Sequence, residues 1–242
     1  MIDLSGKRAF VTGGGRGIGR ATAAMLARAG AKVAVGYRSR KPAPDAHVVA
    51  AVRGDLGTST GATKAVAEAL RALGGSLDIL VINHGVWPPD DVPVAKMTDE
   101  QWESTRRANL DAVIYVCRAA IPNITEGGTI VLVASTAGQR GEAFHADYAA
   151  TKGAVIAITK SLAVELAPKI TINCVAPGWV DTEMSTKPYA AGGRAAIEKT
   201  IPLRRVASAE DIAGPIVFLS SPLARHITGE ILNVNGGSVL CG

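Results

Sequence analysis

Residues 12–19 read Thr12-Gly13-Gly14-Gly15-Arg16-Gly17-Ile18-Gly19, and this stretch decides the fold. It follows an apolar run at residues 8–11 that predicts a strand, and it opens residues 18–29, where apolar side chains recur at helical spacing. Its glycines permit a tight turn and a close approach of other atoms to the backbone. The free amides at the start of the helix attract phosphate groups. The stretch differs from the literal G-x-G-x-x-G pattern, so its position between strand and helix is what predicts a dinucleotide site.

Short apolar runs alternate with helical patterns along the rest of the chain. Continuously apolar strands that alternate with amphipathic helices are typical of a parallel sheet covered on both faces. The pattern therefore predicts one doubly wound α/β domain of the Rossmann-like class over residues 1–242. The predicted strands lie at residues 8–11, 32–35, 48–52, 78–82, 129–133, 170–175 and 231–234. The predicted helices lie at residues 18–29, 63–73, 99–120, 146–166 and 210–219.

Two stretches depart from this alternation. Residues 39–47 replace the helix that would join the second and third strands, because Pro42 and Pro44 oppose a regular helix. Residues 181–203 form a connection that is long for a compact domain, and they contain Pro188 and two adjacent glycines. We predict a loop at the first stretch and a substrate lid at the second.

The composition of the 242-residue chain is that of a globular protein, with 48% hydrophobic and 19% charged residues. Its three cysteines, Cys117, Cys174 and Cys241, lack the spacing of a metal site and indicate reduced thiols in the cytoplasm. No apolar run is long enough to cross a bilayer, and the N-terminal residues lack the order of a signal peptide. The net charge of +5 is spread over small groups, so we expect neither a nucleic-acid nor a membrane partner.

Tyr148 and Lys152 are four residues apart in the helix predicted at 146–166, so their side chains share one face. A phenol has an unperturbed pKa of about 10, and a neighbouring ammonium group lowers that pKa by favouring the phenolate. The pair is therefore suited to acid/base work at a carbonyl or alcohol carbon. Ser135 follows the strand predicted at 129–133, at the sheet edge where ligands bind in such folds. Alone, the pair is typical of a helix surface and Ser135 of an ordinary strand end, but together behind the glycine loop they favour catalysis.

Several motifs occur in an order that resembles the short-chain dehydrogenase/reductase family, and the resemblance covers essentially the whole chain. The motifs are Thr12-Gly-x-x-x-Gly17-x-Gly19, Asn83-His84-Gly85, Asn109, Ser135, Tyr148-x-x-x-Lys152 and Pro177-Gly178. The resemblance implies that Tyr148 is the acid/base and that Ser135 holds the substrate oxygen. It further implies that Lys152 binds the nicotinamide ribose and that Asn109 anchors a water in a proton relay. It also implies a homotetramer.

The residues after the second predicted strand indicate which nicotinamide cofactor binds. They read Gly36-Tyr37-Arg38-Ser39-Arg40-Lys41 and contain no carboxylate to bind a ribose 2′-hydroxyl. Arg38, with Ser39 and Arg40, is suited to a 2′-phosphate, although the same residues also fit a solvated turn. We therefore predict NADP(H). The resemblance assigns the cofactor contacts to Gly13, Arg16, Gly17, Ile18, Gly19, Arg38, Ser39, Asp55, Leu56, Asn83, Gly85, Tyr148, Lys152, Pro177, Gly178, Val180 and Thr182.

The substrate end of the site is less well defined by the sequence. The C-terminal stretch at residues 201–237 is most similar to 3-oxoacyl-acyl-carrier-protein reductases, which favours a carbonyl reductase with 3-oxoacyl thioesters as candidate substrates. An NAD-dependent alcohol or polyol dehydrogenase is the alternative. A non-catalytic dinucleotide-sensing protein is a further alternative. The presence of both Tyr148 and Lys152 argues against it. The predicted substrate-binding residues are Ser135, Tyr148, Trp87, Arg140, His145 and Trp179.

Overall fold

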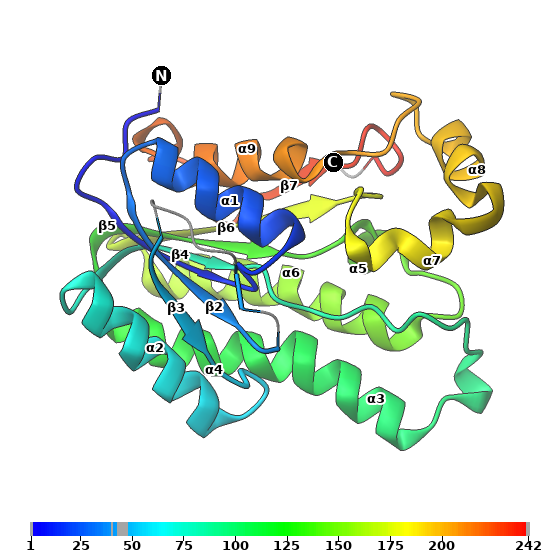
Figure 1. The fold of residues 1–242 in the computed structure, drawn as a ribbon, viewed down its shortest axis with the longest axis horizontal. Coiled ribbons are helices and arrows are strands. Elements are labelled where there is room, and N and C mark those ends of the chain that lie inside the picture. The colour runs from blue at the N-terminus through cyan, green and yellow to red at the C-terminus, as the bar shows by residue number, and fades with distance from the viewer. Residues whose placement is uncertain (1, 40, 43–47, 241–242) are drawn as a thin grey trace.

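The computed structural model describes residues 2–39, 41–42 and 48–240. Within these residues, seven parallel strands form one sheet in the order β3-β2-β1-β4-β5-β6-β7 (Figure 1). The strands are β1 (Arg8–Thr12), β2 (Lys32–Tyr37), β3 (Val48–Arg53), β4 (Leu77–Ile82), β5 (Ile124–Val133), β6 (Ile170–Pro177) and β7 (Ile231–Val234). The strand order reverses between β1 and β4, which creates the switch point where open α/β sheets bind ligands. The predicted doubly wound parallel sheet is confirmed.

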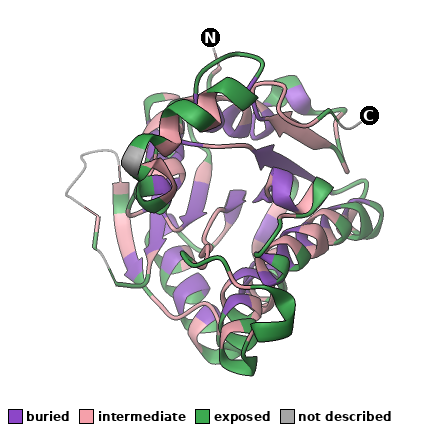
Figure 2. Ribbon diagram, turned by 90° about the vertical axis from the view of Figure 1, so that its right-hand side faces the viewer, coloured by how far each residue is buried: buried purple, intermediate pink, exposed green. Residues whose placement is uncertain are grey.

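Helices cover both faces of the sheet. α1 (Gly17–Arg28) and α9 (Ala209–Leu219) lie on one face, and α2 (Ser59–Leu73), α4 (Ala112–Ala120) and α6 (Ala146–Leu166) lie on the other (Figure 1). These helices carry their buried residues on the side that faces the sheet (Figure 2). The remaining α-helices are α3 (Asp99–Arg106), α5 (Thr136–Arg140), α7 (Thr186–Tyr189) and α8 (Gly193–Thr200). Short 3₁₀ turns lie at Val94–Lys96, Ile121–Asn123, Glu183–Ser185, Ala190–Gly192 and Pro222–Ala224.

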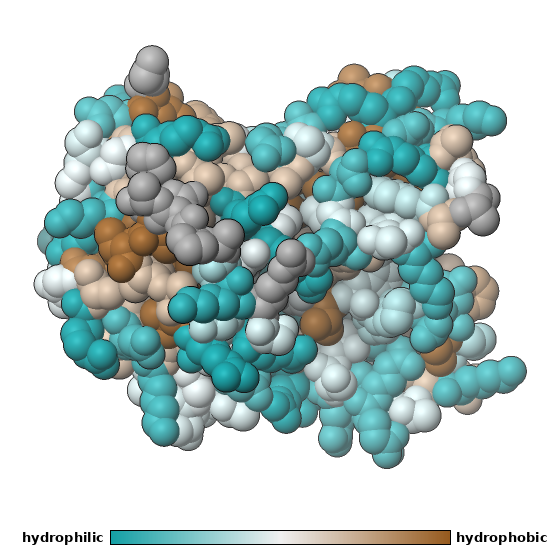
Figure 3. Space-filling model, in the orientation of Figure 1, coloured by the Kyte–Doolittle hydropathy of each residue, from teal (hydrophilic) through white to brown (hydrophobic). Residues whose placement is uncertain are grey.

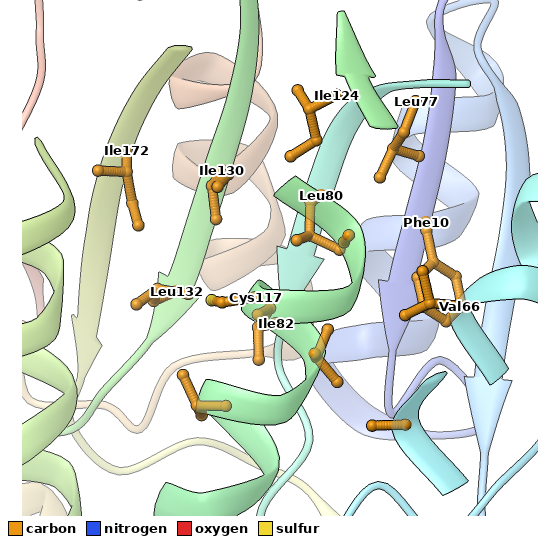
Figure 4. Close-up of a cluster of buried hydrophobic side chains, with 14 of the residues drawn as sticks. Phe10, Val66, Leu77, Leu80, Ile82, Cys117, Ile124, Ile130, Leu132 and Ile172 are labelled. Carbon is orange, nitrogen blue, oxygen red and sulfur yellow. The ribbon is translucent and has the colours of Figure 1, made fainter. Parts of the chain in front are cut away.

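Two apolar cores attach the helices to the sheet. The core beneath α2, α4 and α6 contains Phe10, Leu80 and Ile130 (Figure 4). The core beneath α1 and α9 contains Ile79 and Val131. Neighbouring residues of β4 and β5 thus point to opposite faces of the sheet, as strand geometry requires. Each fully buried side chain of this size contributes about 1.5–3 kcal/mol to folding.

Polar side chains cover most of the face of the molecule shown in Figure 3, where hydrophobic side chains appear in small groups. Within the described residues, no helix has both the length and the apolar character needed to cross a membrane.

The connection between β2 and β3 contains no helix in its described part, which is residues 38, 39, 41 and 42. Arg40 and residues 43–47, Pro44 among them, lie outside the described residues. The edge strand β3 has a single buried residue, Val52, and its Val49 is 51% exposed. A sheet edge without a covering helix has this exposure, so the described part agrees with the predicted loop.

Besides the earlier starts of α2 and β5 and the unpredicted helix α5, the structure differs from the sequence prediction in two segments. The helix predicted at 99–120 is interrupted at Arg107–Asp111 by a π-helical turn, which separates α3 from α4. Such turns are frequent at functional sites. The connection predicted at 181–203 contains α7 and α8, so most of it is helical. Its action as a lid stays a prediction.

Candidate active site

A cleft of about 520 Å³ opens at the carboxyl ends of the strands, on the side of the sheet where α5 and α7 lie (Figure 1). The segments that follow β1, β2, β4, β5 and β6 form its walls. The cleft brings together most of the predicted site residues, and the exceptions are Gly19 and Asn109, which are buried, and His145, which lines a neighbouring cavity. The predicted residues that line it are Gly13, Arg16, Gly17, Ile18, Arg38, Ser39, Asp55, Leu56, Asn83, Gly85, Trp87, Ser135, Arg140, Tyr148, Lys152, Pro177, Gly178, Trp179, Val180 and Thr182.

The glycine loop after β1 has no room for side chains. Gly13 has a φ of +67°, and a Cβ there would lie 2.9 Å from Nδ2 of Asn83. A Cβ on Gly19 would lie 2.3 Å from the carbonyl oxygen of Gly13, which explains why the helix can approach the strand so closely. Gly17 has a φ of +49° and begins α1, so the free amides of this helix face the cleft. A cradle of backbone amides without side chains fits the pyrophosphate of a dinucleotide.

Ser135 and Tyr148 meet at the other end of the cleft. Ser135 follows β5 and caps α5, where its hydroxyl accepts a hydrogen bond of 3.1 Å from the amide of Ala137. Tyr148 lies in the first turn of α6, and its hydroxyl forms a hydrogen bond with that of Ser135. Two hydroxyl groups that converge at the cleft can hold one carbonyl oxygen between them.

Burial raises the pKa of Tyr148 to about 12, even though the hydrogen bond with Ser135 acts in the opposite direction. The carboxylate of Glu142 contributes to the increase. We predicted a lowered pKa from the neighbouring ammonium group, and that prediction is wrong for the protein without its cofactor. The physical reason is that the buried phenolate loses more hydration than its neighbours return. The phenol is therefore protonated at neutral pH and able to donate its proton.

Lys152 lies one turn beyond Tyr148 and is buried. Its Nζ lies 5.8 Å from the centroid of the Tyr148 ring and donates a hydrogen bond of 2.9 Å to the carbonyl oxygen of Val133. Burial lowers the pKa of Lys152 to about 8, and the nearby Cys174 acts weakly in the opposite direction. The lysine therefore keeps its positive charge at neutral pH, close to its point of titration.

Asn109 lies in the π-helical turn and is completely buried. Its Nδ2 donates to the carbonyl oxygen of Val86 at 2.9 Å, and the amide of Val86 donates to its Oδ1 at 2.8 Å. A Cβ on Gly85 would lie 3.2 Å from Oδ1 of Asn109 and 3.4 Å from Nζ of Lys152. Asn109 thus holds the segment after β4 directly beside Lys152. Its predicted role in a water relay stays a prediction.

Basic side chains surround the opposite, adenosine end of the cleft. Arg38 and Ser39 line it after β2, and Arg16 lines it from the glycine loop. Arg16 forms an ion pair of 3.1 Å with Glu183, which lies beyond β6. Asp55 lines the same end, and its carboxylate accepts hydrogen bonds from the amide of Gly57 and from the guanidinium of Arg107.

Arg107 lies at the start of the π-helical turn, and its guanidinium lies 2.5 Å from the carboxylate of Asp55. The sequence prediction did not include Arg107, since the contact joins residues that are far apart in the chain. The ion pair is about half exposed on both sides, so we ascribe to it a positioning effect on Asp55 rather than a large gain in stability.

His84 forms a hydrogen bond through Nδ1, whereas its buried Nε2 has no hydrogen-bond partner among the described residues. Its Nδ1 lies 2.8 Å from Oγ1 of Thr12, at the end of β1. Burial and the charge of Lys152 lower the pKa of His84 to about 3. The ring is therefore neutral at physiological pH and does not titrate there.

Aromatic side chains form the substrate side of the cleft. The ring of Trp87 lies nearly parallel to that of Tyr148, with centroids 6.0 Å apart. Trp179 lies 5.1 Å and His145 5.0 Å from Trp87, so both predicted wall residues contact it. Tyr189 of α7 lies 5.9 Å from Trp179 and was missed, because nothing in the sequence shows that residues 181–203 fold back onto Trp179.

The cysteines form no cluster in the described part of the chain. Cys117 and Cys174 are buried, and burial raises the pKa of each thiol to about 12. Cys241 lies outside the described residues. Across the residues that the structure describes, no three side chains of His, Cys, Asp or Glu come together as metal ligands.

The fold and the cleft together define a dinucleotide-dependent oxidoreductase of the α/β class. Residues 13–238 match the protein-family model described as enoyl-(acyl carrier protein) reductase. The chain is 37% identical over 246 residues to the 3-oxoacyl-[acyl-carrier-protein] reductase FabG of Escherichia coli, with 98% of each chain covered. The chain belongs to the short-chain dehydrogenase/reductase family.

Solved structures of this family are closely similar to the fold. A short-chain dehydrogenase/reductase from Brucella melitensis, described as a glucose/ribitol dehydrogenase, has a TM-score of 0.93 at 33% identity, with 99% of each chain covered. A short-chain dehydrogenase from Burkholderia cenocepacia in complex with NADP has a TM-score of 0.87 at 34% identity, with 97% of this chain and 98% of that chain covered.

Proposed function

We propose that the protein is an NADP(H)-dependent carbonyl reductase in which Tyr148 is the proton donor. The observation that carries this proposal is the convergence of the Ser135 and Tyr148 hydroxyls in a cleft beside the buried Nζ of Lys152. A carbonyl oxygen placed between the two hydroxyls receives a hydrogen bond from each, which polarises the C=O bond.

Proton transfer follows from the protonation states of these groups. When bound, the nicotinamide ring supplies the hydride that reduces the carbonyl carbon. Tyr148, whose pKa of about 12 keeps it protonated, transfers its phenolic proton to the substrate oxygen as negative charge develops there. The substrate C=O double bond becomes a C–O single bond, with one new C–H bond and one new O–H bond. The proton that Tyr148 loses is replaced from solvent. Ser135 holds the substrate oxygen during the transfer.

Lys152 has two tasks in this proposal. Its ammonium group lies near the phenol and stabilises the transient phenolate after proton transfer. It would also bind the ribose hydroxyls of the cofactor, in exchange for its hydrogen bond to the carbonyl oxygen of Val133. Asn109, which holds the adjacent segment, is our candidate anchor for the water that returns the proton.

The preference for NADP(H) rests on charge at the adenosine end. Arg38, Ser39 and Arg16 line the cleft there, and the residue that ends β2 is Tyr37, which cannot bind a ribose 2′-hydroxyl as a carboxylate does. Guanidinium groups are well suited to a 2′-phosphate. The relative from Burkholderia cenocepacia, described in complex with NADP, supports this choice.

Three further features belong to the proposal. 3-Oxoacyl thioesters are a candidate substrate class because several relatives bear that activity in their names. Residues 181–203 would close over the substrate as a lid. A homotetramer would cover apolar side chains such as Val164 on α6, which is 82% exposed, and Ile114 on α4, which is 40% exposed.

The proposal is tested by a screen of NADPH and NADH oxidation with acetoacetyl coenzyme A, simple ketones, quinones and sugars. The reverse reaction is measured with NADP⁺ or NAD⁺ and polyols. We expect reduction of a carbonyl compound with NADPH, and a loss of kcat by a factor of about 10²–10⁴ in Tyr148→Phe. Turnover confined to polyols with NAD⁺ would instead support the alternative function, a polyol dehydrogenase, which the description of the Brucella relative suggests.

A further inference from the structure

A row of aromatic rings leads away from the catalytic phenol. Trp87 lies nearly parallel to Tyr148, with an angle of 22° between their planes and 6.0 Å between centroids. Trp179 continues the row at 5.1 Å from Trp87, and Tyr189 follows at 5.9 Å from Trp179. The rings come from three segments, after β4, after β6 and on α7, so they form a wall and not a single stripe. A substituent of a carbonyl compound held by Tyr148 can lie along this wall.

A second cavity of about 520 Å³ lies beside the catalytic cleft at this wall. Trp87, Trp179 and Met184 line both cavities, so the two are adjacent. Phe144, Pro89 and Pro188 provide further apolar lining. The volume is within the range of sites that bury drug-sized molecules. The wall and the second cavity thus offer room for a bulky, flat, apolar group beside the reacting carbon.

The charges around the second cavity disfavour an anionic substrate. Among the described residues that line it, Lys187 is the one lysine or arginine, and its ammonium group is bonded to Asp90. Asp91 also lines the cavity and is largely exposed, and Glu142 lines it while paired with Arg140 at 3.1 Å. A phosphate group would meet carboxylates here and no unpaired lysine or arginine. Coenzyme A and the arm of an acyl carrier protein both contain phosphate.

One donor in the wall is unsatisfied. The indole Nε1 of Trp87 is buried and has no hydrogen-bond partner among the described residues. A buried donor without a partner is unfavourable, and a ligand acceptor that reaches it would remove this cost. An acceptor atom or an electron-rich ring on the substrate is suited to this position.

We propose that the substrate is an uncharged aromatic ketone or aldehyde, whose ring binds against Trp87 and Trp179 and extends into the second cavity. This inference rests on the proposed carbonyl reductase activity and names its substrate class. It differs from the thioester class suggested by relatives, because the aromatic wall provides ring contacts and the rim provides no counterion for phosphate.

The first test compares substrates on the wild-type protein. NADPH oxidation is measured with 2-acetylnaphthalene, with 2-dodecanone as an aliphatic ketone of equal carbon number, with acetoacetyl coenzyme A, and with cyclohexanone as a small reference. We expect kcat/KM for 2-acetylnaphthalene to exceed the values for the aliphatic ketone and the thioester by roughly tenfold or more, since aromatic contacts add to simple burial. A higher kcat/KM for the thioester, or equal values for the two ketones, would overturn the inference.

The second test uses variants of the wall and the rim. Trp179→Leu should lower the ratio of aromatic to aliphatic kcat/KM by roughly tenfold, whereas the matched control Trp102→Leu, on α3 and outside both cavities, should leave the ratio unchanged. Asp91→Asn should lower KM for acetoacetyl coenzyme A without changing KM for the aromatic ketone. An unchanged ratio in folded Trp179→Leu contradicts the inference, and circular dichroism establishes that the variant is folded.

The outcomes separate the two proposals. If no carbonyl compound is reduced with NADPH, the proposed function fails and the substrate class fails with it. If cyclohexanone or the thioester is reduced, Tyr148→Phe abolishes the reaction and the aromatic ketone has no advantage, the proposed function holds and the substrate inference alone is rejected.

Discussion

The ammonium nitrogen of Lys152 lies 5.8 Å from the ring centroid of Tyr148 on one face of α6, where Lys152 is buried and Tyr148 is half-buried at the cleft. Burial shifts their pKa values in opposite directions, since it raises the pKa of the phenol to about 12 and lowers that of the lysine to about 8. The cofactor-free site therefore holds one neutral acid beside one cation that is close to titration.

The first prediction concerns the charge of Lys152. Lys152→Met keeps the length of the side chain but removes the cation that stabilises the phenolate and binds the ribose. We expect kcat/KM to fall by a factor of about 10²–10⁴ and KM for NADPH to rise. Steady-state kinetics with the best carbonyl substrate measure both. A variant that retains wild-type kcat/KM would exclude Lys152 from the reaction.

The second prediction concerns Glu142, whose carboxylate raises the pKa of Tyr148. Glu142→Gln removes a negative charge that opposes the phenolate, so the pKa of Tyr148 should fall. Oxidation of an alcohol requires the phenolate, and its rate should therefore rise at a lower pH than in the wild type. Reduction requires the phenol. As the pH rises, the rate of reduction should therefore begin to decline at a lower pH than in the wild type. The pH profiles of kcat in both directions measure this, with Glu126→Gln, an exposed change on β5, as the control.

The third prediction concerns cofactor choice. Arg38→Ala removes a guanidinium from the adenosine end of the cleft. The ratio of kcat/KM with NADPH to that with NADH should fall at least tenfold, because a charge-assisted contact with the 2′-phosphate is lost. Arg28→Ala, an exposed arginine at the far end of α1, is the matched control. An unchanged ratio in Arg38→Ala would show that other residues discriminate between NADPH and NADH.

The fourth prediction concerns the glycine loop. Gly19→Ala places a Cβ 2.3 Å from the carbonyl oxygen of Gly13, so the start of α1 must move. We expect a loss of roughly 1–3 kcal/mol in the free energy of unfolding and weaker NADPH binding. Gly214→Ala in α9, which lies outside the cleft, is the control for cofactor binding and should leave NADPH binding unchanged. Thermal unfolding and NADPH fluorescence titration give the two readouts.

The fifth prediction concerns acid stability. Burial tends to raise the pKa of Asp78, but hydrogen bonds from Arg8 and Thr125 outweigh burial and lower it below the ordinary value of 3.8. A carboxyl whose pKa is lower in the folded state stabilises the fold above pH 3.8, and this stabilisation is lost as the pH falls through the folded-state pKa.

Asp78→Asn should therefore lower the free energy of unfolding by roughly 1–3 kcal/mol at pH 7. The difference in the free energy of unfolding between the variant and the wild type should shrink as the pH falls below 3.8. Urea unfolding at several pH values measures it, and a difference that is equally large in strong acid would contradict the linkage.

The parts of the fold that the sequence predicts are those whose requirements are local. The helix at Ala146–Leu166 and the strand at Ile231–Val234 match their predicted bounds, and α6 places Tyr148 and Lys152 on one face as their spacing requires. The glycine loop was identified because its backbone demands a residue type that is visible in the chain. Family resemblance then supplied roles for Ser135 and Asn109, which local pattern alone leaves open.

The remaining features depend on contacts between distant segments. The π-helical turn holds Asn109 against Val86, twenty-three residues earlier, and no helical pattern reveals that contact. The second cavity combines segments after β4, β5 and β6, and the contact of Tyr189 with Trp179 depends on how the segment after β6 folds back on itself, so neither could be predicted. The pKa of Tyr148 was predicted in the wrong direction because its sign depends on how completely the fold excludes water.

The ion pair between Arg16 and Glu183 joins the glycine loop to the segment beyond β6 across the adenosine end of the cleft. A 2′-phosphate that takes Arg16 as its partner competes with a carboxylate already in place. The affinity gained from this arginine is therefore the difference between two ion pairs, and added salt weakens both sides of the exchange. Neutralising Glu183 would remove this competition for Arg16, and it would also remove an ion pair between the glycine loop and the segment beyond β6.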